Sequence, residues 1–422
     1  MKTCKTSLRT TARGAALAAA LGCALPALAT NGYFPHGYGI KAKGMGGVST
    51  ATADDALGGA TNPAKMAFAG SRLDLGLEWF SPRRDAERTG AGPLSGKVTS
   101  EKETFWVPEL GYNRALGDTW AVGLTVYGNG GMNTTYPQGS FDCGGGPANA
   151  MCGGGKLGVD LMQLVVAPTV AFKLAGRHAL GASLLLGYQR FKAEGLQAFD
   201  TPMASRAPGS VTNNGYDDAS GAGLRIGYLG RLSDAFSLGA AYSSKVDMSR
   251  FKKYAGLFAG QGDFDIPSNW NVGVAFTPAP GWTLAADYQR INYSDVRSVS
   301  NPSMVQVQLG EDGGPGFGWR DIGVFKIGLA WQASPALVVR AGYNRGDNPI
   351  RASDVTFNIL APGVMTDHYT LGFTYALGAS GEISGAAMVA PRQTVTGASM
   401  FAGTETIGMR QYSLSLGWSM KF

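Results

Sequence analysis

The chain has 422 residues, of which 16% are charged and 63 are glycine. The formal net charge of +6 comes from 36 basic and 30 acidic residues, and Lys2, Lys5, Arg9 and Arg13 supply four of the basic ones. Without these four residues the balance is 32 basic against 30 acidic residues, so the charge gives no support for a nucleic-acid-binding protein.

The first residues have the pattern of an export signal. The four basic residues precede or adjoin a short Ala/Leu-rich run over 14–25, and Pro26 separates this run from the small-x-small sequence 27–29. Because the run is too short to cross a bilayer as a helix, we expect residues 1–29 to be a signal peptide that is removed. Cys23 leaves a lipoprotein site as the alternative.

The next stretch, residues 31–64, fits no strand pattern. Its glycines permit tight bends and a close approach to another backbone; they are Gly37, Gly39, Gly44, Gly46 and Gly47. Asp54-Asp55 and Asn62-Pro63 suit a short helix followed by a fixed turn. We expect residues 30–70 to form a hatch that closes a channel, with a mobile periplasmic tail as the alternative.

The remaining residues, 71–422, alternate between strand patterns and loops. In the last strand, over 411–422, apolar residues alternate with small or polar ones, and aromatic residues lie near both ends. This two-residue period is typical of a lipid-facing strand. Similar patterns predict fourteen strands, at 71–80, 103–114, 119–128, 159–174, 178–192, 216–231, 235–246, 269–277, 282–292, 319–332, 336–346, 366–377, 381–390 and 409–422.

The predicted connections are of two alternating kinds. Every second one is a tight turn, such as 116–118, and the others are long and rich in Gly, Pro and Asn. This arrangement is typical of a bacterial outer-membrane barrel, and an even strand number places both termini in the periplasm. Because strand side chains cannot fill so wide a barrel, it is a water-filled channel unless something blocks it. The sequence therefore predicts an all-β fold, a 14-stranded antiparallel transmembrane β-barrel (71–422) plugged by the N-terminal hatch.

Two cysteines, Cys143 and Cys152, lie in the Gly-rich loop CGGGPANAMC. In an exported, oxidised compartment we expect them to form a disulfide. Two thiols without a nearby histidine make only half of a zinc site, so we expect no metal. The three histidines, His36, His178 and His368, fall on separate parts of the predicted topology, which argues against an enzyme. No phosphate-binding loop is present in the sequence, and we expect no cofactor.

Several motifs are spread along the chain. They are Gly44-Met45-Gly46-Gly47, Ala53-Asp54-Asp55, Asn62-Pro63-Ala64, Gly158-Val159-Asp160-Leu161, Trp319-Arg320-Asp321, Arg340-Ala341-Gly342-Tyr343 with Pro349, and the terminal strand 412–422. As a set they resemble the long-chain fatty acid transporters of the outer membrane, the FadL/TodX family. The resemblance implies a fourteen-stranded barrel with an N-terminal hatch. It also implies that a hydrophobic carboxylate enters from outside and leaves sideways through the wall.

The same resemblance implies three groups of site residues. The exit lies at a kink in the third strand beside the Asn-Pro-Ala turn, which gives the gate residues Asn62, Pro63, Ala64, Tyr127, Gly128 and Gly130. Basic residues of strands five and ten hold the carboxylate, and the candidates are Arg190 or Lys192, and Arg320. Apolar lining comes from the hatch residues Tyr33, Phe34, Tyr38 and Met45, and an outer landing site from Leu257, Phe258 and Phe317. The alternatives are an ordinary strand-to-loop junction, solvated lumen charges and loops packed on themselves.

A lateral exit also makes physical sense. An acyl chain gains about 0.8 kcal/mol per CH₂ on leaving water for an apolar phase, and moving it into the bilayer keeps this gain. We therefore expect passive, hatch-gated uptake of long-chain fatty acids or similar hydrophobic compounds. The alternatives are a transporter of aromatic hydrocarbons and a general diffusion porin. We expect a monomer in the outer membrane, surrounded by lipid and lipopolysaccharide, with its N-terminus in the periplasm.

Overall fold

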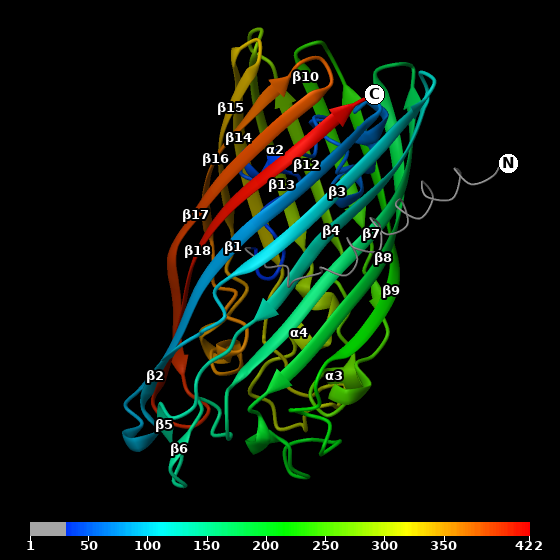
Figure 1. Ribbon diagram of the computed structural model, residues 1–422. Helices are drawn as coiled ribbons and strands as arrows, with labels where there is room; N and C mark the ends of the chain where they lie inside the picture. The colour runs from blue at the N-terminus through cyan, green and yellow to red at the C-terminus, as the bar shows by residue number, and fades with distance from the viewer. Residues whose placement is uncertain (1–30) are drawn as a thin grey trace, which may run out of the picture.

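The computed structural model describes residues 31–422, so the predicted signal peptide 1–29 lies outside the described residues. Its main sheet has 16 strands, of which β2 (Gly96–Thr99) and β11 (Asp247–Met248) are short additions to β1 and β9. The other fourteen pair antiparallel with both neighbours and close into a barrel, because β18 pairs with β1 and β9 pairs with β10 (Figure 1). They are β1 (Arg72–Thr89), β3 (Phe105–Leu116), β4 (Trp120–Asn133), β7 (Gly158–Leu174), β8 (His178–Glu194), β9 (Asp217–Arg231), β10 (Phe236–Ser243), β12 (Asn269–Phe276), β13 (Trp282–Ile291), β14 (Ile322–Ser334), β15 (Leu337–Gly346), β16 (Asp367–Leu377), β17 (Gly381–Ala398) and β18 (Thr404–Lys421). The fourteen-stranded barrel predicted from the sequence is confirmed.

The strands form because apolar and polar residues alternate with the period of a pleated strand. In β18, Leu414 and Leu416 point outward and are 58% and 62% exposed, whereas Ser413 and Ser415 are buried on the inward face. The outward faces together make an apolar surface, which a membrane barrel needs to contact lipid. None of the helices among residues 31–422 is long and apolar enough to span a membrane.

The two ends of the barrel differ, as the sequence predicted. In Figure 1 the tight turns lie at the upper end with the C-terminus, and the long connections lie at the lower end. The long connections carry several short elements; these are η3 (Gly92–Leu94), β5 (Phe141–Asp142), β6 (Pro147–Ala148), η4 (Gln197–Phe199), η5 (Lys252–Tyr254), α3 (Ala259–Gly262), η6 (Tyr293–Asp295), α4 (Arg297–Ser300), η7 (Ala352–Asp354) and η8 (Phe357–Ile359). Cys143 and Cys152 form the predicted disulfide beside β5 and β6, with a Cα–Cα distance of 5.6 Å.

Several strands, including β1, β17 and β18, run further toward the long-loop end than predicted. β1 continues to Thr89 and pairs along its whole length with β18, and β17 continues to Ala398 past an irregularity after Ala390. The sequence did not indicate this extension because the outward positions of β1 there are charged, including Arg83 and Asp85. Backbone pairing therefore continues where the apolar alternation has ended.

Residues 31–71 lie inside the barrel and are mostly buried (Figure 1). This hatch contains α2 (Ile40–Lys43), η1 (Gly58–Ala60) and η2 (Pro63–Ala67). Glycines of the hatch meet glycines of the wall, and a Cβ on Gly372 of β16 would lie 2.8 Å from the Cα of Gly44. The expected close approach of the hatch backbone to the wall is therefore present.

Candidate functional site

Buried ion pairs hold the hatch in the barrel. Lys43 of α2 lies 2.7 Å from Glu78 of β1 and 3.0 Å from Glu109 of β3, and Lys41 lies 2.5 Å from Glu382 of β17. Although burial opposes it, the charges of Glu109 and Glu78 raise the pKa of Lys43 above its usual value, so this lysine stays charged. Because removing one partner of such a pair would leave an uncompensated buried charge, the ion pairs hold the hatch against these three strands.

A second anchor is Asp287 of β13. One of its carboxylate oxygens accepts hydrogen bonds from the backbone nitrogens of Ser49 at 2.8 Å and Thr50 at 3.0 Å, and from the Thr50 hydroxyl at 2.7 Å. Asn271 of β12 donates to the same hydroxyl at 2.7 Å. The hatch is therefore attached to β17, β1 and β3 on one side of the barrel and to β12 and β13 on the opposite side. In this position it blocks the direct route along the barrel axis.

Backbone pairing between β3 and β4 is interrupted toward the long-loop end of the barrel. These strands pair only from Glu109 opposite Tyr127 to Leu116 opposite Trp120. Toward the long-loop end, β3 pairs only with β1, and residues 128–133 of β4 pair only with β7. The backbone hydrogen bonds between the two strands are thus missing over residues 105–108 of β3 and 128–133 of β4. We call this region the β3–β4 opening.

The opening begins at the predicted kink in the third strand. The register between β4 and β7 shifts between Gly128 and Gly130, so Asn129 is an extra residue that bulges. The Asn129 amide is buried inside, where it donates to Gln163 at 3.1 Å and accepts from the Tyr38 hydroxyl at 3.2 Å. The expected loss of pairing at this glycine-rich stretch is present, and its role as a gate stays a prediction.

The start of the hatch passes directly behind the opening. A Cβ on Gly130 would lie 2.2 Å from the carbonyl oxygen of Tyr33, so the two backbones touch. The ring of Tyr38 packs edge-on against that of Tyr127, with centroids 4.8 Å apart. The hatch residues nearest to the opening are therefore Tyr33 and Tyr38.

The Asn-Pro-Ala turn lies elsewhere, which corrects one expectation. The Asn62 amide donates to the carbonyl of Tyr228 in β9 at 2.8 Å, and its oxygen caps η2 by accepting from the Ala64 nitrogen at 3.1 Å. A Cβ on Gly181 of β8 would lie 2.4 Å from the carbonyl carbon of Pro63. The turn packs against the fifth and sixth strands near the short-turn end, because glycines there admit its backbone. It is not beside the β3–β4 opening.

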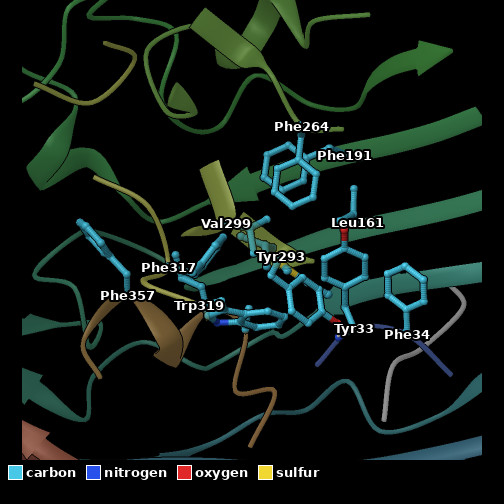
Figure 2. Packing of buried hydrophobic residues seen from close by; sticks show 14 of the residues in the cluster. Tyr33, Phe34, Leu161, Phe191, Phe264, Tyr293, Val299, Phe317, Trp319 and Phe357 are labelled. Carbon is cyan, nitrogen blue, oxygen red and sulfur yellow. Dashed lines mark hydrogen bonds between the residues drawn. The ribbon is translucent and has the colours of Figure 1, made fainter. Parts of the chain in front are cut away.

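Aromatic side chains of the hatch join an aromatic cluster formed with the long loops. Figure 2 shows Tyr33 beside Tyr293 and Trp319, and the ring centroids of Tyr33 lie 5.3 Å and 5.9 Å from theirs. Phe34 lies 5.4 Å from Tyr33 in the same cluster. Met45 is separate from them, since it packs against wall glycines such as Gly328 of β14. The four predicted lining residues therefore do not form one pocket.

Two apolar pockets lie on the long-loop side of the hatch. The first, the outer pocket, lies among the loops, and its lining includes Phe191, Phe199, Leu257, Phe258, Phe317 and Phe357. It contains all three residues expected to form an outer landing site. The second, the gap pocket, is narrow, and its lining includes Tyr33, Phe80, Arg84, Met132, Trp319 and Met409. Because Tyr33 and 131–133 line it, the gap pocket lies directly behind the β3–β4 opening.

The three basic residues predicted to face the interior do not do so. Arg190 and Lys192 share the outward face of β8 with Leu186 and Tyr188, and the Arg190 side chain is 42% exposed. Its guanidinium lies 3.9 Å from the ring centroid of Tyr216. Lys192 pairs with Glu194 at 3.1 Å. Strand parity sets this orientation, so the expected inward placement of both residues is wrong.

Arg320 is exposed in the connection before β14, where it donates to the carbonyl of Asn348 at 3.1 Å. Arg84 of β1 is the basic residue that lines the gap pocket, and sequence analysis missed it. A signal was present, because the outward apolar positions Leu75 and Leu77 fix the parity of β1 and place position 84 inside.

The histidines also differ in part from expectation. His178 hydrogen-bonds Tyr228 at 2.7 Å near the short-turn end, whereas His36 and His368 stack with ring centroids 6.2 Å apart. Burial lowers the pKa of His36 to about 4, so this ring is neutral at neutral pH. Within residues 31–422 no group of three or more His, Cys, Asp or Glu side chains could hold a metal ion.

The sequence matches the family described as outer membrane protein transport protein (OMPP1/FadL/TodX) over residues 19–396. Comparison with curated protein sequences gives no match. Similar solved structures include the Pseudomonas putida toluene transporter TodX, with a TM-score of 0.69 and 22% identity, covering 93% of this chain and 100% of that one. They also include a Pseudomonas aeruginosa FadL homologue, with a TM-score of 0.68 and 14% identity over 93% of this chain and 100% of that one. The Ralstonia pickettii toluene transporter TbuX has a TM-score of 0.65 and 19% identity over 92% of this chain and 99% of that one. The chain therefore belongs to the OMPP1/FadL/TodX family of outer-membrane transport channels, which are not enzymes.

Proposed function

We propose that this barrel takes up hydrophobic compounds, such as long-chain fatty acids, by passive diffusion that ends in lateral exit through the β3–β4 opening. One observation carries the proposal: the gap pocket lies directly behind a stretch of wall without strand pairing, while the hatch blocks the axis. The similar structures include toluene transporters, which supports a hydrophobic cargo.

The path has three parts. The outer pocket, lined by Phe and Leu side chains, captures the compound from the medium. Trp319 lines the gap pocket and Phe317 the outer pocket, and their rings lie 6.3 Å apart, so the two pockets adjoin. From the gap pocket the compound passes between β3 and β4 into the membrane, which preserves the gain of about 0.8 kcal/mol per CH₂.

Only a small part of the hatch has to move. Tyr33 and Tyr38 cover the opening from inside, and they are held by ring contacts and single hydrogen bonds. The ion pairs of Lys41 and Lys43 and the bonds to Asp287 can stay intact during this movement. A general diffusion porin, by contrast, requires an open axis, which the seated hatch opposes.

Deletion of Asn129 tests the route. Without the extra residue β4 can pair continuously with β7 and its glycine-rich stretch loses the bulge, so the opening narrows. We expect uptake of labelled oleate and of labelled toluene by cells producing this variant to fall to the level of cells without the protein. Deletion of Gly313, an exposed loop residue with open space around it, is the matched control and should leave uptake unchanged.

Folding of both deletion variants is checked by the heat-dependent mobility that folded barrels show on gels. Uptake that persists at the wild-type rate in a folded Asn129 deletion would exclude lateral exit at this site. Conductance across planar bilayers distinguishes the proposed transporter from a general diffusion porin. A barrel closed by the seated hatch should pass little steady ion current, whereas a porin should pass a large one.

A further inference from the structure

Arg84 spans the outer rim of the β3–β4 opening. Its guanidinium donates to the carbonyl of Asn133, the last residue of β4, and to the carbonyl of Lys102, just before β3. These two strands lack backbone pairing here, so a side chain from β1 connects them, next to the Glu101 nitrogen that donates to the carbonyl of Thr135 at 2.7 Å. Arg84 is only 4% exposed.

The same residue lines spaces on both sides of the wall. Inside, it lines the gap pocket with Phe80 and Met132. Outside, it lines a groove together with the exposed residues Arg83 and Arg410. Anything that moves from the gap pocket through the rim of the opening therefore passes the Arg84 guanidinium.

No acidic side chain neutralises Arg84. Among residues 31–422 it makes no ion pair, and its Nε is buried without a hydrogen-bond partner. The nearby acids are paired with other arginines, Glu103 with Arg83 at 3.1 Å and Asp85 with Arg392 at 2.7 Å. The Phe105 ring, 5.7 Å away, is a weak substitute for an anion. A buried cation that bonds only neutral carbonyls is costly, and a bound anion would offset that cost.

From this geometry we infer, on the basis of the proposed function, that Arg84 binds the head group of a hydrophobic monocarboxylate in the gap pocket. The lining holds no acid and is otherwise mostly apolar, which suits an acyl or aryl body. The free Nε and the remaining Nη hydrogens provide the paired donors that a carboxylate accepts. The head group stays at the polar rim while the apolar body enters the membrane through the opening. Arg84 thereby selects carboxylates over neutral hydrocarbons.

Binding of oleate and of oleyl alcohol to the purified protein in lipopolysaccharide-free detergent tests this inference at pH 8. The two ligands share an apolar chain and differ in the charged head. We expect the wild-type protein to bind oleate about tenfold more tightly than the alcohol, and Arg84→Gln to remove this preference while leaving alcohol binding unchanged. A tenfold ratio corresponds to about 1.4 kcal/mol, a modest value for a charge-assisted contact.

Two variants complete the comparison. Arg83→Gln removes the neighbouring outward arginine and should keep the preference for oleate. Arg84→Lys retains a positive charge, so it should keep much of the preference for oleate. It also provides a second variant for the same binding measurement if Arg84→Gln does not fold. A wild-type oleate-to-alcohol ratio in a folded Arg84→Gln protein would overturn the inference. So would an Arg84→Lys protein that shows no more preference for oleate than Arg84→Gln.

Lipopolysaccharide phosphate is another anion available near the outer groove. Adding lipopolysaccharide to the oleate complex should leave oleate bound; displacement of oleate would assign Arg84 to lipid phosphate and overturn the inference. Failure of the proposed function has a different signature, because the wild-type protein would then bind and take up neither oleate nor the alcohol.

Discussion

Gly342 of β15 and Gly46 of the hatch are in direct backbone contact, since a Cβ on Gly342 would lie 2.1 Å from the Gly46 nitrogen. The other two atoms nearest to that position belong to Met45, so a side chain there would push only against the hatch. Gly46 itself has a φ of +69°, a conformation that L side chains rarely adopt. This contact fixes how deeply the hatch is seated.

Gly342→Ala should therefore displace the hatch without disturbing the strand. We expect a several-fold rise in ion conductance across planar bilayers, and greater sensitivity of cells to antibiotics that the outer membrane normally excludes. Gly313→Ala, at an open loop position, is the control and should not change either measurement. Wild-type conductance in the Gly342→Ala protein would show that the hatch does not seal the axis.

Lys43→Met should loosen the hatch through electrostatics. The substitution leaves Glu78 and Glu109 buried without their cation, which costs about 3–5 kcal/mol. Urea should then release the hatch at a lower concentration, measured as proteolysis of the segment 31–67 in the folded barrel. Replacing both glutamates by glutamine in the Lys43→Met background should recover much of the loss.

The exposed pair Lys97–Glu87 provides a comparison, since its side chains are 61% and 41% exposed. Lys97→Met should cost less than about 1 kcal/mol because water screens this pair. If Lys43→Met and Lys97→Met had equal effects, the buried ion pairs would not be what holds the hatch.

His36 makes hatch seating dependent on pH. Burial lowers its pKa to about 4, whereas in a released hatch the ring has its ordinary pKa of 6.5. The seated state thus binds fewer protons, and its stability is fully present above pH 6.5 and falls as the pH drops toward 4. The shift in pKa corresponds to roughly 3 kcal/mol of seating free energy. The hydrogen-exchange protection factors of residues 36–48, which correct for the intrinsic slowing of exchange at lower pH, should fall between pH 7 and pH 4.5, and His36→Gln should flatten this dependence. Equal pH profiles in the two proteins would contradict the assignment to His36.

Most of the barrel could be predicted from local alternation. The outward face of β18 and the tight turns repeat a pattern that needs no knowledge of distant contacts. The same alternation predicts that Arg190 points outward. Leu184, Leu186 and Tyr188 mark the outward positions of β8, and the two-residue period continues to position 190. Arg320 differs, since it precedes β14 and no alternation fixes its direction.

Other features depend on contacts between distant parts of the chain. The stacking of His36 on His368 depends on how deeply the hatch is seated in the barrel, and no local sequence pattern determines this depth. The place of the Asn-Pro-Ala turn is set by glycines of β8 and β9 that make room for it, including Gly181. The glycine-rich stretch of β4 indicated weak pairing, but only the register with β7 reveals that Asn129 is the extra residue.

The outer pocket should control capture at low ligand concentration. Leu257 lines this pocket and is partly buried, so Leu257→Asp places a charge where the ligand's apolar body would lie. We expect uptake of labelled oleate and toluene at limiting concentration to fall several-fold, with recovery as the concentration rises, because later steps are unchanged. Met203→Asp is the control, since Met203 is 91% exposed in a neighbouring loop and outside the pocket. A reduction of the same size in both variants would point to a general surface-charge effect. Normal uptake in Leu257→Asp would mean that compounds reach the gap pocket without stopping at the outer one.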